Sequence, residues 1–426
     1  TYFEQGQYNA AMIEARSALQ IDASNEAANL LISDIYLSLG SGRQALRTLQ
    51  SIESDSYEYT LRLIDAMLAV GKYGTALHLL RQNESLFADN EIESLLRVAE
   101  ARIGLRDIEN ASLNYQKVRD LDATNIDAIL GLIAIDAATG RLEKADAALR
   151  ELLKEIPQDS DVLVLQANVF VKQGRLEEAE SSLTEAISAL PSSDVFTEQR
   201  AGLLRALIRL LAFQGNSAEA LIYQNQLAVA FPNAAAINEQ MNNVAELVEN
   251  ADFESALVVL DEIELIAPGN ESTGTLRAVI AFLQGDNQAA SELFRENVDP
   301  EIASAKTMQL FAANQLYLNQ PHQVVALLRD KISDTKNPQT LALFGVAALS
   351  ADAAQEGVTA LRKAIDLEPD NVRLSVILAS HLRINDPAKA LQELQTAYAR
   401  KRDDLYLNLA LMSELLSLGY TDRAAE

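Results

Sequence analysis

A short module recurs along the chain with a period of about 34 residues. Its start is marked by a glycine or a residue in the same place, and successive markers lie 31 to 36 residues apart except for one interval of 41. Five residues after each marker stands a small side chain, which is Ala in eleven of thirteen modules and Val325 or Gly357 in the others. The markers are Gly6, Gly40, Gly71, Arg106, Gly140, Gly174, Gly215, Ala251, Gly285, Gln320, Asp352, Asn385 and Gly419. Such a period with a small residue at fixed phase is typical of a helical repeat array.

Each module reads as a helix, a short turn and a second helix. Around Gly174, apolar residues return every three or four positions over 161–172 and again over 176–190, which is helical spacing. Glycine permits the left-handed turn, and Ala179 falls where the two helices cross closely. Proline is expected to stop the second helix twelve residues after the small residue. These prolines are Pro157, Pro191, Pro232, Pro268 and Pro369.

One module cannot bury its apolar face alone, so neighbouring modules must stack to form a core. We therefore predict an all-α protein, a right-handed superhelical solenoid of about a dozen helix pairs. Thr1 and Glu426 both fall inside a module, so we expect the chain to be a fragment of a longer protein.

The module resembles the tetratricopeptide repeat (TPR). The sequences Gly6–Ala11, Gly71–Ala76 and Gly174–Ala179 match its second-helix pattern, and the last is followed by Ala186 and Pro191. The chain has no Trp, so the usual first-helix Trp must be replaced by Leu or another apolar residue. The resemblance implies an interaction scaffold that binds peptides or proteins in a groove lined by the first helices. Another helical solenoid of similar period is the alternative.

The net charge of −26 and the isoelectric point near 4.5 limit the partners. Nucleic acid and anionic membranes require a basic face, so neither is expected. The acidity indicates either a well-solvated surface or a groove that attracts a basic segment of a protein partner. The chain has no Cys, which leaves the compartment open, and no apolar run long enough to span a membrane.

Enzyme signatures are missing from the sequence. There is no glycine-rich phosphate loop, and the three histidines, His78, His322 and His381, fall in distant modules where they cannot converge on a metal ion. We therefore predict no catalytic, cofactor or metal site, and a protein that is not an enzyme.

Residues six positions before each marker should face the groove. The first three of these residues, Asp34, Asp65 and Glu100, are acidic and suggest a recognition stripe in the N-terminal modules. Acids thirteen positions before the marker, such as Asp127 and Asp161, are explained by the helix dipole. Arg205 and Arg209 lie four apart on one helix face, where they could bind a carboxylate or pair with acids of the neighbouring module. The candidate partner-binding residues are Asp34, Asp65, Glu100, Asn168, Arg205 and Arg209.

The interval of 41 between Gly174 and Gly215 is the one long spacing. We expect a lengthened first helix there, capped by residues 192–194 and running through Thr197 to Phe213. This predicts two lobes, an N-terminal one over 1–190 and a more divergent C-terminal one over 191–426. The alternative is one continuous solenoid with a locally long helix.

The N-terminal segments Tyr2–Glu14 and Ala18–Asp22 resemble the opening repeats of bacterial TPR lipoproteins of the PEP-CTERM/exosortase type. That resemblance implies a periplasmic or envelope protein with a lipid anchor outside this sequence, serving exopolysaccharide production, export or protein sorting. The alternatives are a cytoplasmic location, and a regulatory region of a larger protein whose effector or catalytic domain lies elsewhere.

Overall fold

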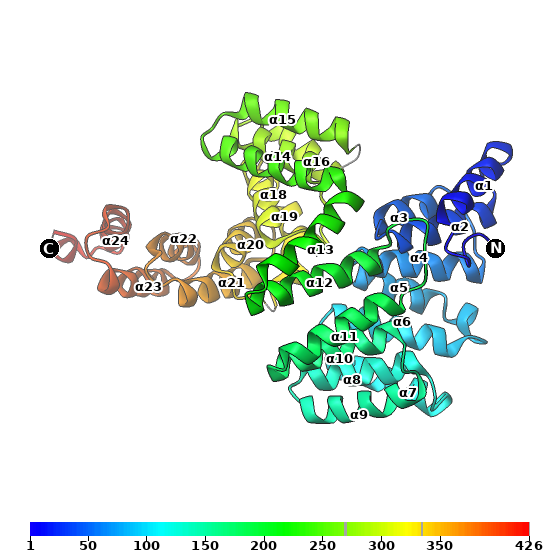
Figure 1. The fold of residues 1–426 in the computed structure, drawn as a ribbon. Helices are drawn as coiled ribbons and strands as arrows, with labels where there is room; N and C mark the ends of the chain where they lie inside the picture. The colour runs from blue at the N-terminus through cyan, green and yellow to red at the C-terminus, as the bar shows by residue number, and fades with distance from the viewer. Residues whose placement is uncertain (268–270, 334, 426) are drawn as a thin grey trace. The chain divides into compact units, whose positions relative to one another are not determined.

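The computed structural model describes residues 1–267, 271–333 and 335–425, so Pro268 and Glu426 lie outside the described residues. Within these ranges the regular structure consists of 25 α-helices and two short 3-10 helices, with no strand (Figure 1). The predicted all-α array of helix pairs is confirmed. The chain divides into two compact units, Thr1–Ala235 (unit 1) and Ala236–Glu426 (unit 2).

Unit 1 is built from thirteen α-helices and one 3-10 helix. They are α1 (Tyr8–Ile21), α2 (Glu26–Ser38), α3 (Gly42–Gln50), α4 (Tyr57–Ala69), α5 (Tyr73–Gln82), η1 (Glu84–Phe87), α6 (Glu91–Gly104), α7 (Ile108–Leu121), α8 (Ile126–Ala138), α9 (Leu142–Glu155), α10 (Ser160–Gln173), α11 (Leu176–Ala189), α12 (Glu198–Gln214) and α13 (Ser217–Ala230).

Helix α14 (Pro232–Glu249) begins at the boundary, and the remaining helices belong to unit 2. They are α15 (Phe253–Ile266), α16 (Glu271–Leu283), α17 (Asn287–Asn297), α18 (Ala305–Tyr317), α19 (Pro321–Leu328), η2 (Arg329–Lys331), α20 (Pro338–Ser350), α21 (Ala354–Leu367), α22 (Val372–Leu382), α23 (Pro387–Arg400), α24 (Leu405–Ser417) and α25 (Thr421–Ala425).

The turn between the two helices of a module uses a left-handed residue, as predicted. The glycine markers all have positive φ, and Arg106, Ala251 and Asp352 adopt φ values of 62°, 57° and 50° in the same place. Two markers depart from this pattern: Asn385 is not among the residues with positive φ, and Gln320 has φ −116° while its neighbour Asn319 has φ 55°. Because the turn at Asn319 lies one residue earlier than predicted, Val324 takes the small-residue position, and it is fully buried.

The small residues lie at close helix crossings. Twelve of the thirteen predicted positions are buried, and Ala424 is half-buried. The contact is tightest between α20 and α21, where a Cβ added to Gly357 would lie 2.9 Å from the carbonyl oxygen of Gly345. A side chain at this phase therefore sets how closely the helices of a pair approach.

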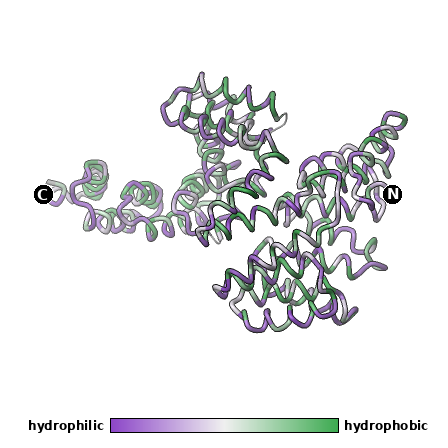
Figure 2. The backbone as a smooth tube through the Cα atoms, in the orientation of Figure 1, coloured by the Kyte–Doolittle hydropathy of each residue, from purple (hydrophilic) through white to green (hydrophobic). Residues whose placement is uncertain are grey.

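The core is a series of clusters that cross from one module to the next. In unit 1 one cluster runs from Ala45 to Ala101, and another from Leu163 to Ala220. Figure 2 shows apolar and polar residues alternating along the helices. No helix in the described ranges has the length and apolar character needed to cross a membrane.

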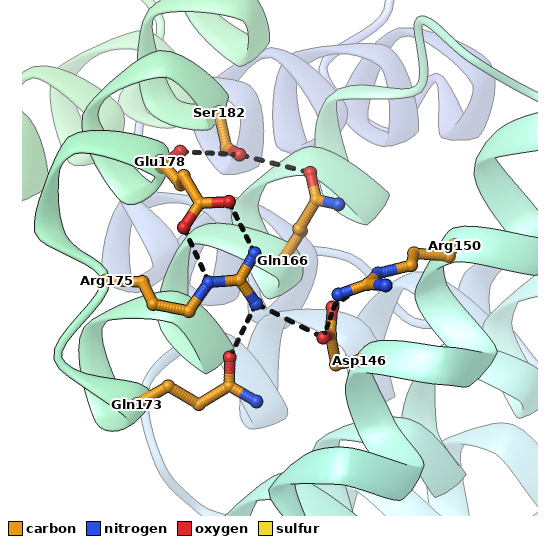
Figure 3. Close-up of polar contacts among 7 residues, drawn as sticks. All are labelled: Asp146, Arg150, Gln166, Gln173, Arg175, Glu178 and Ser182. Carbon is orange, nitrogen blue, oxygen red and sulfur yellow. Dashed lines mark hydrogen bonds and ion pairs between the residues drawn. The ribbon is translucent and has the colours of Figure 1, made fainter.

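A polar network joins two successive modules on the second-helix side (Figure 3). The side chain of Asp146 on α9 is only 10% exposed and accepts from Arg150 Nε and from Arg175 Nη1, each at 3.2 Å. Arg175 also donates to Glu178 at 2.6 Å, and its guanidinium lies 4.0 Å from the centre of the Phe170 ring. The hydrogen bonds from Arg175, together with its charge, lower the pKa of Glu178. Part of the acidity of this chain is therefore structural.

The long interval between Gly174 and Gly215 contains a non-helical connection between α11 and α12 as well as a longer helix. Helix α12 has 17 residues but begins at Glu198, with the Thr197 hydroxyl accepting from the Arg200 amide. The expectation that residues 192–194 cap α12 is wrong. The predicted division after residue 190 stays a prediction, and residues 191–235 lie in unit 1.

The connection returns to the first helix of unit 1. Asp194 accepts from the backbone N–H groups of Tyr8 and Asn9 at 2.8 and 3.1 Å, and its own N–H donates to the Gly6 carbonyl oxygen at 3.0 Å. The residue that precedes α1 makes no side-chain capping bond, so Asp194 satisfies the free N–H groups of α1 from 185 residues away. Figure 1 shows this segment running from α11 past the N-terminal helices to α12. The contact closes unit 1 on itself.

Replacing Asp194 with Ala should destabilise α1 locally, because it removes the acceptor for two N–H groups. We expect a loss of about 0.5–2 kcal/mol, the usual cost of a lost helix cap. Amide hydrogen exchange should accelerate at Tyr8 and Asn9, while Asp120→Ala, on the exposed end of α7, should leave both amides unchanged. Equal exchange in the two variants would contradict the capping role.

Replacing Ala179 with Leu should destabilise unit 1 by about 1–3 kcal/mol, because the added side chain overpacks a fully buried crossing. Glu177 is the matched control, since it is exposed on the same helix, whereas Glu178 is paired with Arg175. Thermal unfolding of Glu177→Leu should match the unmodified chain. Similar changes in melting temperature for both variants would contradict the placement of Ala179 at the helix crossing.

Candidate functional site: the concave groove of unit 1

A cavity of about 550 Å³ opens between the first helices of consecutive modules in unit 1. Its walls come from α4, α6, α8 and α10, with one side chain from α7. The lining residues are Asp65, Leu96, Arg97, Glu100, Tyr115, Asp127, Leu130, Gly131, Ala134, Asp161, Val164, Leu165 and Asn168. We call this cavity the groove. The phase that was expected to face it, six residues before each marker, supplies Asp65, Glu100, Ala134 and Asn168.

Ion pairs join the first helices of successive modules beside the groove. Arg62 Nε on α4 lies 3.5 Å from Asp34 Oδ1 on α2. Arg97 on α6 binds Asp65 on α4 through two bonds, Nε to Oδ1 at 2.9 Å and Nη2 to Oδ2 at 3.2 Å. Both arginines stand nine residues before their module's marker and pair with the acid of the preceding module. We call these pairs the ladder.

The ladder explains the electrostatics of its members. Burial raises the pKa of Asp34, and the charge of Arg62 opposes that shift. Burial acts to lower the pKa of Arg97, but the hydrogen bonds and charge of Asp65 outweigh it and the pKa is raised. Asp34 and Asp65 therefore each have an arginine partner within the fold. Their first role is to hold successive modules together.

Glu100 is the next acid in the series, and it has no arginine. The residue of α8 that corresponds to Arg62 and Arg97 is Gly131, and Glu100 forms no hydrogen bond or ion pair with any residue that the structure describes. The Tyr115 ring covers Gly131, where an added Cβ would lie 2.4 Å from the ring. The third position of the ladder therefore has an acid but no arginine, and we call it the open position. The Tyr115 ring occupies the place where a side chain of residue 131 would begin.

Glu100 is exposed in the groove and has no cation bonded to its carboxylate. Partial burial raises its pKa, and the nearby charges of Asp65 and Asp127 raise it further, while Arg97 acts in the opposite direction. Burial together with Glu100 and Asp127 raises the pKa of Tyr115 to about 12. The Tyr115 hydroxyl therefore stays protonated at neutral pH. The groove offers carboxylates beside an aromatic ring and apolar walls.

The structure brings only some of the predicted residues together. Asp65, Glu100 and Asn168 line the groove, whereas Asp34 lies one module earlier in the ladder. Arg205 forms an ion pair with Glu198 of its own helix rather than with an acid of a neighbouring module, and Arg209 is not part of the groove lining. Partner binding by these six residues stays a prediction.

Four residues that shape the groove were missed. Arg62, Arg97 and Gly131 share the position nine residues before the marker, and a comparison of the modules at that phase would have found them. Tyr115 belongs to a second helix, where the sequence gives no sign that its ring reaches the groove. Within the described parts of the chain, no group of His, Cys, Asp and Glu is arranged to hold a metal ion.

Two segments, residues 2–60 and 102–169, match the family model of the tetratricopeptide repeat. The similar solved structures include a chain of the APC/C hetero-tetramer Cut9–Hcn1, 13% identical with a TM-score of 0.37, covering 98% of this chain and 88% of that one. YrrB, described as a TPR protein with an unusual peptide-binding site, is 15% identical with a TM-score of 0.38, covering 43% and 97%. The P58(IPK) TPR domain is 14% identical with a TM-score of 0.24, covering 78% and 99%. No curated protein matches the chain in sequence. Residues 2–60 and 102–169 therefore resemble tetratricopeptide repeats, and the resemblance of the N-terminal module to PEP-CTERM-type lipoproteins gains no support.

Replacing Glu100 with Gln should stabilise the chain at neutral pH. The pKa of Glu100 is raised from its ordinary value of 4.5, so folding favours the protonated form and stability falls as the pH rises through the folded-state pKa. The gain at pH 7 should be less than about 1 kcal/mol, because water reaches the groove and screens the charge.

Urea unfolding of Glu100→Gln and the unmodified chain at several pH values checks this. The difference between them should vanish below about pH 4.5, where both side chains are neutral. Glu177→Gln should show no difference at any pH. A Glu100→Gln variant that is less stable at pH 7 would contradict the open ladder position.

Proposed function

We propose that the chain is an interaction scaffold that holds a peptide segment of a partner protein in the unit 1 groove. The observation that carries this is the groove itself, a concave surface on consecutive first helices with apolar walls and unpaired polar groups. Its volume of about 550 Å³ is within the range of binding sites and accommodates several side chains. The tetratricopeptide repeats in the same unit favour binding without catalysis.

The charge of the groove favours a partner with a basic segment. Glu100 and Asp127 line it without an ion pair among the described residues, and the whole chain is strongly acidic. Acidic surfaces attract cationic segments over the Debye length, which is about 8 Å at physiological ionic strength. Binding should therefore weaken as salt is added.

A role in envelope export, exopolysaccharide production or protein sorting is a finer proposal. Its support is the resemblance of residues 2–22 to bacterial lipoprotein repeats. The same proposal places the protein in the periplasm or cell envelope, with a lipid anchor outside this sequence. Fractionation of cells that make the native protein tests it, and recovery from the cytoplasm would overturn it. The alternative function, a regulatory region of a larger protein, would use the same groove.

Filling the groove should abolish peptide binding. Ala134 is an exposed lining residue of α8, so Ala134→Trp adds bulk to the groove without entering the core. Twelve-residue peptides selected from a display library on the full chain should bind by calorimetry and lose binding to Ala134→Trp. Thr184→Trp, on the exposed outer surface of α11, is the matched control. Peptides that bind both variants equally would show that the groove is not the binding surface.

A further inference from the structure

We propose that the open ladder position recognises an arginine side chain of the bound peptide, which completes an ion pair with Glu100. This inference rests on the proposed function, because it names the partner chemistry for the same groove. The partner's guanidinium would stand where the fold places its own arginines in the two preceding positions.

The ladder itself defines the ligand. An acid of one module meets an arginine of the next at Asp34–Arg62 and again at Asp65–Arg97. At the third repeat the acid remains as Glu100, but Gly131 replaces the arginine and the Tyr115 ring lies over Gly131 as part of the groove lining. Glu100 is exposed to the groove, no described cation bonds to it, and the charges of Asp65 and Asp127 disfavour its ionised form. A cation from outside would offset that repulsion.

Arginine fits this position better than lysine does. The Asp65–Arg97 pair is bidentate, which is the geometry that a planar guanidinium gives with a carboxylate. The Tyr115 ring and the side chains of Leu130 and Leu165 provide surface for the methylene groups of the incoming side chain. Asp127 supplies a second carboxylate in the same groove. The other groove acids are engaged: Asp65 binds Arg97, and Asp161 accepts from Gln199 at 3.2 Å.

The test uses peptides selected on the full chain, with the unmodified peptide and a version in which arginine is replaced by citrulline. Citrulline keeps the shape of the side chain and removes its charge. We expect groove-binding peptides to contain arginine, and citrulline to weaken binding about tenfold to a hundredfold, the usual effect of losing a hydrogen bond to a charged group. Lysine in the same place should also weaken binding, because it cannot make the bidentate contact.

The matching change on the protein is Glu100→Gln. It should weaken binding of the arginine peptide by a similar factor and leave the citrulline peptide unaffected, so the two changes should not add. Glu177→Gln, an exposed acid outside the groove, should change neither affinity. Circular dichroism and thermal unfolding confirm that the variants are folded.

The outcomes separate the two proposals. Peptides that lose binding to Ala134→Trp but are indifferent to citrulline and to Glu100→Gln would overturn the arginine inference and leave the groove as the binding surface. If no selected peptide is sensitive to Ala134→Trp, both proposals fail. Sensitivity to Ala134→Trp together with non-additive losses for citrulline and Glu100→Gln supports both.

Discussion

The distance between the two helices of each pair is set by one small buried residue. Where this residue is Ala, or Gly as at Gly357, the helix backbones approach until a larger side chain would collide with the facing helix. The left-handed residue five positions earlier turns the chain so that this approach is possible. Within unit 1, successive pairs stack on one another, and the first helices α4, α6, α8 and α10 line one groove. The groove, the ladder and the clustered core all follow from that repeated approach.

The stacking of modules also repeats charged contacts. The arginine of one first helix lies beside the acid of the preceding first helix, and this contact occurs at Arg62–Asp34 and again at Arg97–Asp65. A partly buried ion pair contributes little net stability, because desolvation offsets much of the attraction, but removing one partner leaves a costly charge. Glu100 lacks such a partner, but it is exposed to solvent in the groove, which lowers the cost of its charge.

The fold could be predicted from local signals, and the site only in part. Gly174 and Ala179 act within one module, so their spacing predicts the turn, the crossing and the array. The position of Glu100 beside the groove was predicted, because it lies six residues before its marker. The pairing of Asp65 with Arg97 was not predicted, because it requires comparing the modules at the position nine residues before the marker. The bond from Asp194 to α1 was out of reach, since it depends on the curvature accumulated over five modules between residues 185 positions apart. The marker was assigned to Gln320 instead of Asn319 because the turn shifts by one residue where Pro321 starts the next helix.

The ionisation of Glu100 tests the central claim most directly. Its side-chain carboxyl carbon can be followed by NMR titration, with the signal identified by its loss in Glu100→Gln. An open ladder position predicts a pKa above 4.5 in the free chain, and a pKa that falls when an arginine-containing groove peptide is bound, because the guanidinium stabilises the carboxylate. A pKa at its ordinary value in the free chain, unchanged by the peptide, would contradict the account.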